Sequence, residues 1–211
     1  PHGNSTTNVK IQEALEAVLN GAMEIDMVVN IGKVLSADWE YVKEEILKIK
    51  KILQRIPLKV IFENGYLKDE HIIKLCEICS SLHVDFVKTS TGFAYVKNGY
   101  SLGGIEKKGA NEEQVKLMRE KSRVNIKIKA SGGIETLDDI IKFYKLGARR
   151  FGTSSTEKIM KEVYRRHLLE NDKKEEEYHP KLDSGDCPTG VECSSCSKRY
   201  AEEQDKYNKD E

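Results

Sequence analysis

Two lysines stand at the ends of neighbouring apolar segments, Asp85-Phe-Val-Lys88 and Lys127-Ile-Lys129. If the two segments are adjacent parallel strands about 4.8 Å apart, the ammonium groups of Lys88 and Lys129 approach one another. Mutual repulsion and burial then favour the neutral amine, which is the form that attacks an aldehyde. The pair therefore predicts Schiff-base chemistry, with one lysine as the nucleophile and the other lowering its pKa. The alternative is that both side chains simply extend to water at the rim of the sheet.

An aspartate lies within a third apolar segment, Glu24-Ile-Asp-Met-Val-Val-Asn30. Burial of Asp26 there is costly unless the carboxylate is paired or carries protons. Asp26 is therefore the third candidate catalytic residue. Because side chains alternate along a strand, Glu24 faces the same side as Asp26, and Lys127 the same side as Lys129. We expect Glu24 and Lys127 to meet as a deeper ion pair.

Two glycine-containing turns follow the last two apolar segments, Gly132-Gly133 and Gly152-Thr-Ser-Ser155. In α/β barrels the loops after the final two strands commonly bind phosphate, because free N–H groups and a helix N-terminus face the anion. Each turn alone is equally typical of an ordinary helix cap. Together they predict a phosphate site made by Gly132, Gly133, Gly152, Ser154 and Ser155.

These residues are set in a repeated pattern, in which short apolar runs alternate with segments of helical period. The expected strands are Glu24–Asn30, Leu58–Asn64, Asp85–Thr91, Asn125–Ala130 and Arg149–Gly152. Helix starts are marked by Asp38, Asp69, Asn111 and Thr136, the last forming a capping box with Asp139. A further helix is expected over Thr6–Asn20, closed by Gly21.

Five βα units indicate an α/β fold, and two architectures fit them. A (β/α)8 TIM barrel needs eight strands, so five cannot close it. An open doubly wound sheet of five strands is the alternative. The chain begins with Pro1 rather than Met. We therefore expect an incomplete barrel of about five βα units, lacking its first three strands.

Two segments fall outside this repeat. Residues 96–108 are polar and Gly-rich and follow a candidate catalytic strand. They are expected to be either a tolerated surface insertion or a flap over the site. From Asn171 the chain is charged and almost without large apolar residues, so a disordered tail over 171–211 is expected after a barrel domain over 1–170.

The tail also contains a weak metal-binding pattern. Its CxxC spacing is usual for zinc, but no second pair of ligands follows. The four possible ligands are Cys187, Cys193, Cys196 and His179. We expect no metal there, and we expect the three cysteines to be exposed thiols.

Composition narrows the class of partner. Lys plus Arg and Asp plus Glu both number 35, so no field of one sign favours nucleic acid or an anionic membrane. The apolar runs are far shorter than the roughly 20 residues of a membrane span. The five cysteines lie in two clusters and lack the spacing of a disulfide framework. The sequence therefore predicts that the protein resides in the reducing cytoplasm. No dinucleotide-binding or Walker loop occurs in the sequence.

Four stretches resemble the deoxyribose-phosphate aldolases, a class I family that works through a lysine Schiff base. The similarity runs from the first residues to about Met160, and the lysine segment is highly specific. The matching stretches are Glu24-Ile-Asp-Met-Val-Val-Asn-Ile-Gly32, Phe86-Val-Lys-Thr-Ser-Thr-Gly-Phe93, Lys129-Ala-Ser-Gly-Gly-Ile134 and Arg150-Phe-Gly-Thr-Ser-Ser155.

The resemblance implies roles for single residues. Lys88 is similar to the Schiff-base lysine, Lys129 to the second lysine that tunes it, and Asp26 to the aspartate of the proton relay. Thr91 would help to position the substrate. The phosphate would be held by Gly132, Gly133, Ser154 and Ser155.

The resemblance further implies a cytoplasmic TIM barrel that forms homo-oligomers, often dimers, and needs no metal or organic cofactor. Its reaction is reversible cleavage of 2-deoxy-D-ribose 5-phosphate to D-glyceraldehyde 3-phosphate and acetaldehyde, in deoxyribose phosphate catabolism. Two alternatives remain open: another Schiff-base aldolase of sugar phosphates, or an inactive fragment or pseudoenzyme that acts as a binding protein.

This sequence departs from the family pattern at several positions. Phe93 stands where some members have a lysine that assists phosphate binding. Lys127 stands where a small or uncharged residue is common. The tail does not match the family's C-terminus, so Tyr207 is not assigned the role of the final tyrosine that enters the site in some members.

Overall fold

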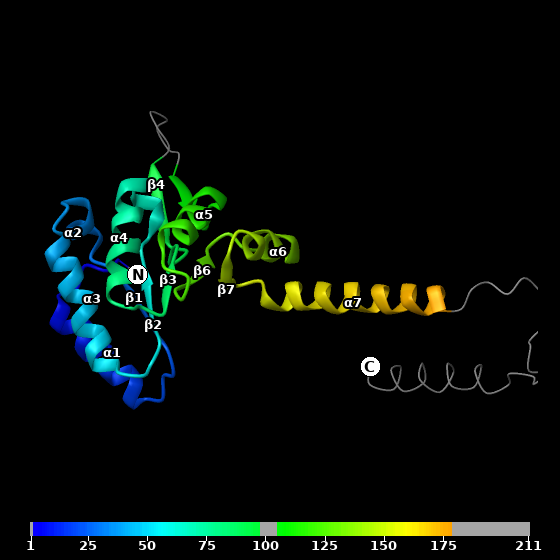
Figure 1. The fold of residues 1–211 in the computed structure, drawn as a ribbon, viewed down its shortest axis with the longest axis horizontal. Helices are drawn as coiled ribbons and strands as arrows, with labels where there is room; N and C mark the ends of the chain where they lie inside the picture. Colours follow the sequence, from blue (N-terminus) through cyan, green and yellow to red (C-terminus); the bar gives the residue numbers. More distant parts are fainter. Residues whose placement is uncertain (1, 98–104, 179–211) are drawn as a thin grey trace, which may run out of the picture. The chain divides into compact units, whose positions relative to one another are not determined.

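The computed structural model describes residues 2–97 and 105–178 of the 211-residue chain (Figure 1). Residues 1–164 form one compact unit, and a second unit begins at Arg165. All five predicted strands are confirmed, with ends that differ by at most three residues. They are β1 (Ile25–Val28), β2 (Leu58–Ile61), β3 (Phe86–Lys88), β6 (Lys127–Ser131) and β7 (Ala148–Gly152).

The helices of the first unit alternate with these strands. The predicted ones are confirmed, and a short helix, α2, and a 3₁₀ turn, η1, are additional. Their bounds are α1 (Thr7–Leu19), α2 (Ile31–Leu35), α3 (Trp39–Leu53), η1 (Asn64–Tyr66), α4 (Asp69–Ser81), α5 (Glu112–Lys121), α6 (Leu137–Lys145) and α7 (Thr156–Tyr178), the last continuing into the second unit.

The strand order decides between the two architectures. The strands lie in the order β1-β2-β3-β6-β7, and every neighbouring pair is parallel. A doubly wound sheet reverses its strand order at a switch point, and this sheet does not. The chain therefore forms an incomplete α/β barrel, and the doubly wound alternative is wrong. Within the described residues, β1 and β7 are the two edges of the open sheet.

The two faces of the sheet differ in chemistry because neighbouring side chains point to opposite sides. One set packs with the helices into the buried core and includes Val60, Val87 and Ile128. The other set carries charge and includes Lys88 and Lys129, each of which forms an ion pair with Asp26. The helices therefore cover one face, and the polar face is left for the site.

Helix caps follow the sequence with one exception. Asp38, Asn111 and Thr136 each accept a backbone N–H at the start of their helices, and Thr136 forms the predicted capping box with Asp139. For α4 the N-cap is Lys68 and not Asp69, which lies in the first turn, where a carboxylate favours the helix dipole. Gly21 follows the C-cap of α1 with φ +97°, and its N–H donates to the carbonyl of Val18.

The described parts of the segment 96–108, residues 96–97 and 105–108, belong to an antiparallel pair of strands. These strands are β4 (Ala94–Lys97) and β5 (Ile105–Lys108), and this hairpin pairing was missed in the sequence. Whether the hairpin acts as a flap stays a prediction.

The last described helix, α7, continues through residues 171–178, where the sequence analysis places the start of the tail. Lys and Glu, which are frequent in this stretch, are good helix formers. The tail predicted beyond Tyr178 and the CxxC pattern lie outside the described residues. Within the described ranges, no helix combines the length and apolar content needed to cross a membrane.

Candidate active site

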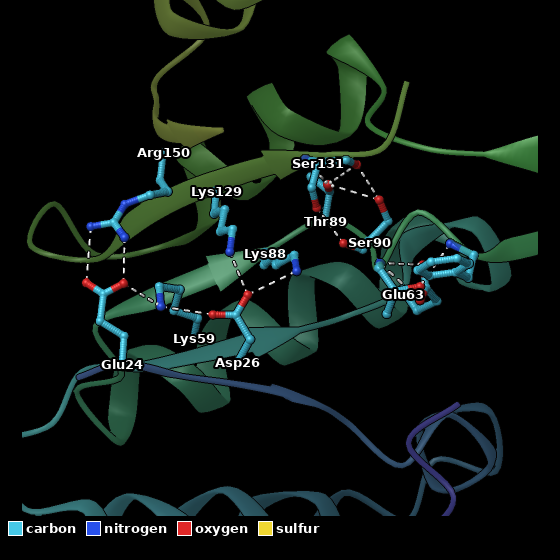
Figure 2. A network of polar contacts seen from close by, with 12 residues as sticks. Glu24, Asp26, Lys59, Glu63, Lys88, Thr89, Ser90, Lys129, Ser131 and Arg150 are labelled. Carbon is cyan, nitrogen blue, oxygen red and sulfur yellow. Dashed lines mark hydrogen bonds and ion pairs between the residues drawn. The ribbon is translucent and has the colours of Figure 1, made fainter. Parts of the chain in front are cut away.

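The three predicted catalytic residues meet on the polar face of the sheet (Figure 2). Lys88 ends β3 and is the register partner of Lys129 on β6. Both ammonium groups contact the same oxygen of Asp26, Oδ2, at 3.0 Å from Lys88 Nζ and 2.6 Å from Lys129 Nζ. The alternative in which both lysines merely extend to water is excluded, because their side chains are only 12% and 15% exposed.

A third lysine joins this group and was missed in the sequence. Lys59 on β2 is 3% exposed, and its Nζ lies 2.9 Å from Asp26 Oδ1 and 2.7 Å from Glu24 Oε2. The sequence contains the same signal for Lys59 as for Asp26, a charged residue within an apolar strand. A charged residue within an apolar strand, Leu58-Lys-Val-Ile61, is costly unless it is paired.

The predicted ion pair between Glu24 and Lys127 is wrong. Glu24 instead pairs with Lys59 and with Arg150, whose Nη1 lies 2.5 Å from Glu24 Oε2. The parity of Lys127 was read correctly, but the sheet order places β6 three strands from β1. The Lys127 ammonium lies 5.5 Å from the centroid of the Phe86 ring, a cation–π contact with its own register partner.

The carboxylates of this cluster are held in the charged form. Burial alone would raise the pKa of Asp26, but hydrogen bonds from Lys129, Lys59 and Lys88 outweigh it and hold that pKa well below its usual range. Hydrogen bonds from Lys59 and Arg150 lower the pKa of Glu24. Both carboxylates therefore stay ionised at neutral pH and compensate the lysines.

Lys129 shows the opposite balance. Burial lowers its pKa, the hydrogen bond to Asp26 opposes that change, and the nearby charges of Lys88 and Lys59 lower the pKa further. The net effect is a pKa of Lys129 below its ordinary value. Lys129 therefore gives up its proton more readily than an exposed lysine does.

The turn after Lys88 is fastened to β6. Thr89 and Ser90 are fully buried, and the hydroxyl of Thr89 accepts the N–H of Ser131 at 3.1 Å. Both Thr89 and Ser90 also donate to the carbonyl of Ser131, and Ser131 Oγ donates to the Ser90 carbonyl. These polar residues were not identified as structural in the sequence.

A pocket of about 390 Å³ opens beside Lys88. It contains most of the predicted substrate-binding residues, and Phe93, which is 64% exposed, also lines it. Ser155 does not line it; its N–H donates to Thr153 Oγ1 at 2.9 Å. The predicted residues in the lining are Lys88, Thr91, Gly132, Gly133, Gly152 and Ser154.

Glycine is required where the hairpin meets the pocket. A Cβ on Gly109 would lie 2.3 Å from the carbonyl oxygen of Gly132. The same carbonyl accepts the N–H of Ala110 at 2.9 Å. Gly132 itself has φ +85°, a conformation that side chains disfavour. Close backbone approach therefore joins the end of β5 to the turn after β6.

Known proteins are similar to this chain in sequence and in fold. Residues 1–162 match the family described as "DeoC/LacD family aldolase". Over 165 residues the chain is 44% identical to a deoxyribose-phosphate aldolase of Rhodopirellula baltica, covering 77% of this chain and 64% of that protein. The chain thus spans about two thirds of the length of this relative.

Solved structures agree with the sequence comparison. An aldolase named QR15 superposes with a TM-score of 0.72 at 40% identity, over 80% of this chain and 71% of that one. The tetrameric deoxyribose phosphate aldolase of Aeropyrum pernix gives 0.65 at 29% identity, over 78% and 64%. The chain therefore belongs to the DeoC/LacD family of aldolases.

Proposed function

We propose that this chain carries the site of an aldolase that reversibly cleaves 2-deoxy-D-ribose 5-phosphate to D-glyceraldehyde 3-phosphate and acetaldehyde. The observation that carries the proposal is the shared carboxylate: Asp26 Oδ2 contacts both Lys88 and Lys129, and Lys88 lines a pocket rich in glycine turns. Similarity to enzymes named for this substrate supports the choice of sugar phosphate.

Lys88 is proposed as the nucleophile because it lines the pocket together with the turns proposed for the phosphate. Its neutral amine adds to the C1 aldehyde, and loss of water gives an iminium. The proton of Lys88 passes to its neighbours, and Lys129 is suited to exchange protons because its pKa is lowered.

Bond cleavage then follows from the iminium. Asp26 and Lys129, through a water molecule, take the proton of the C3 hydroxyl. The C3 oxygen becomes a carbonyl, the C2–C3 bond breaks, and its electron pair moves into an enamine on Lys88. Glyceraldehyde 3-phosphate leaves. The enamine takes a proton at C2, and water hydrolyses the resulting iminium to acetaldehyde and free amine. Each proton transfer contributes about 10²–10⁴ in rate.

Substrate recognition is assigned to the pocket. Thr91 positions the sugar, and the phosphate is placed against the backbone N–H groups of Gly132, Gly133, Gly152 and Ser154. Ser155 contributes only as part of the turn before α7, since its N–H is bonded to Thr153. The proposal includes a homo-oligomer, expected as a dimer, and a cytoplasmic location, which the clumped cysteines support.

The test is borohydride trapping. The protein is incubated with 2-deoxyribose 5-phosphate, reduced, and mapped by peptide mass spectrometry, with Lys88→Met and Lys129→Met as matched variants. We expect an adduct on Lys88, absent in Lys88→Met and formed slowly in Lys129→Met. An adduct on Lys129 in the unaltered protein would reverse the two roles.

The second candidate, an inactive fragment or a binding protein, is favoured by one observation: the chain spans 64% of the length of its Rhodopirellula relative. The same trapping is therefore repeated on an N-terminally extended chain. Label only in the extended chain would make this polypeptide inactive by itself while keeping the family chemistry. No label in either chain would refute the aldolase function.

A further inference from the structure

A buried carboxylate outside the Asp26 cluster holds the loop that follows Lys88. Glu63 is 1% exposed, and both of its carboxylate oxygens lie 3.1 Å from the backbone nitrogen of Thr91. Figure 2 shows Glu63 beside the Thr89–Ser90 turn and apart from Asp26 and its lysines. Burial of a carboxylate is expensive, so the contact of Glu63 with the substrate loop calls for a reason.

The backbone at Glu63 is unusual. Its φ of 57° and ψ of 57° are left-handed, which costs a residue other than glycine about 1 kcal/mol or more. Hydrogen bonds on both sides hold it there. The N–H of Phe62 donates to the carbonyl of Lys88 at 3.0 Å, and the N–H of Asn64 donates to the carbonyl of Thr89 at 2.9 Å. The segment after β2 thus runs beside the segment after β3, and the left-handed residue directs its carboxylate toward Thr91.

What Glu63 holds is the far end of the loop that carries the nucleophile. Thr91 Oγ1 accepts the N–H of Phe93 at 3.0 Å, and Gly92 between them has φ +88°. The near end is already fastened to Ser131 through Thr89 and Ser90. Glu63 therefore supplies the second attachment, at Thr91. Without it, the hydrogen bonds of Thr89 and Ser90 to Ser131 would hold only the near end of the loop.

We propose that Glu63 is a positioning residue, whose carboxylate fixes the Lys88–Gly92 loop so that the Lys88 amine and Thr91 face the pocket. This inference rests on the aldolase function proposed above. Glu63 does not line the pocket and acts only through the Thr91 N–H. Small misplacements of a reacting group cost about 10²-fold in rate, so a single hydrogen bond at this point has a large effect.

Three substitutions separate the carboxylate from the backbone strain. Glu63→Gln keeps the volume and one acceptor oxygen. Glu63→Met keeps the volume and removes both acceptors. Glu63→Gly removes the carboxylate but also relieves the left-handed strain, so this variant is not expected to lose stability through the backbone. The matched control is Glu45→Gln, at another buried glutamate, which accepts the N–H of Asn30 and pairs with Lys10.

Two readouts are measured on each variant. The first is the rate of borohydride-trapped adduct on Lys88 with 2-deoxyribose 5-phosphate, together with kcat and KM. The second needs no substrate: the hydrogen-exchange protection of the Thr91 amide, followed by NMR. We expect trapping and kcat to fall about 10²-fold in Glu63→Met and Glu63→Gly and less than 10-fold in Glu63→Gln. Thr91 protection should be lost in the first two variants and kept in Glu63→Gln and Glu45→Gln.

The outcomes are distinguishable. Folded Glu63→Gly or Glu63→Met proteins that trap substrate at the unaltered rate, or that keep full Thr91 protection, would overturn the inference. If the unaltered protein forms no adduct while Thr91 protection still follows the carboxylate, the aldolase function fails and the attachment of the loop by Glu63 stands. Loss of Thr91 protection in Glu45→Gln as well would show a general loosening and would also overturn the inference.

Discussion

Glu24 and Arg150, which are 126 positions apart in the chain, form a two-contact ion pair across the polar face of the sheet. Arg150 Nη1 lies 2.5 Å from Glu24 Oε2, and Nη2 lies 3.1 Å from Oε1. Glu24 immediately precedes β1, and Arg150 lies on β7, so the pair joins the two edge strands of the described sheet. The sheet is therefore curved enough for its first and last strands to interact over the site (Figure 2).

This pair is expected to give a small, salt-dependent contribution to stability. The two side chains are 30% and 44% exposed, which places the coupling energy at about 0.5–1 kcal/mol at low ionic strength. A double-mutant cycle of Glu24→Gln and Arg150→Met, followed by urea unfolding, measures it. The coupling should shrink as NaCl is raised.

The matched control for this pair is Arg149→Met. Arg149 is the neighbouring arginine, and it donates to the carbonyls of Tyr144 and Ala148. Combined with Glu24→Gln it should show no coupling. Equal coupling for both arginines would mean that net charge, and not the contact, produces the effect.

Lys59 is expected to set the pH dependence of the site. Its hydrogen bond lowers the pKa of Asp26, and its charge lowers that of Lys129. Removing it in Lys59→Met should raise both pKa values. Since the proposed reaction uses Lys129 to exchange protons, the limb of the pH–rate profile that reports Lys129 should move to higher pH. Lys59→Arg keeps the charge and should retain most of the original profile.

Lys59→Met should also unfold at a higher pH when acid is added. The folded-state pKa of Asp26 lies below its usual value, so the stability that it contributes is present above that usual value and is lost as pH falls through the folded-state pKa. Without Lys59 the folded-state pKa of Asp26 is higher, so Asp26 contributes less stability and the loss is complete at a higher pH. Circular dichroism during acid titration measures it, and an unchanged acid midpoint would contradict the role given to Lys59.

Two glycines near the pocket should respond differently to alanine. A Cβ on Gly109 meets backbone atoms of Gly132 at 2.3 and 2.5 Å, so Gly109→Ala must displace the turn, at about 1–3 kcal/mol. Gly133 has φ +73° but open space around it, so Gly133→Ala should cost only the left-handed strain, about 1 kcal/mol. Urea midpoints compare the two, and an equal cost would argue against the close approach of Gly109 to Gly132.

The buried thiol of Cys76 should be inert in the folded protein. Burial raises the pKa of Cys76 from its ordinary value of 9.0 to about 11, and burial also raises that of Cys79. At pH 8 iodoacetamide should therefore label both slowly until denaturant is added, as peptide mass spectrometry can follow. Fast labelling of the folded protein would contradict their burial.

The same shift predicts a loss of stability in alkali. Between pH 9 and about 11 the unfolded chain ionises Cys76 while the folded chain keeps its proton. The contribution of the protonated Cys76 thiol to the free energy of unfolding is complete below pH 9. It is lost as pH rises through the folded-state pKa, at no more than about 1.4 kcal/mol per pH unit. Cys76→Ala should remove this part of the dependence.

The sequence by itself determined the local structure and identified the candidate catalytic residues. Alternating apolar runs located all five strands, because a buried strand needs β-branched and apolar residues over a short length. Asn111 and Thr136 were identified as caps because their side chains accept the N–H groups that a helix leaves unpaired. Lys88 and Lys129 stood out because they end neighbouring apolar segments, and Asp26 because a charge within an apolar strand is costly without a partner.

Only the tertiary structure decided which charges meet. The alternation of side chains along a strand placed Glu24 and Lys127 on the correct face. The order of the strands and the curvature of the sheet, however, pair Glu24 with Lys59 and Arg150. The place of Glu63 beside Thr91 likewise depends on a left-handed residue and on two segments that come side by side only in the folded sheet. Local periodicity fixes the direction in which a side chain points, whereas its partner is set by contacts between residues distant in the chain, which no local pattern contains.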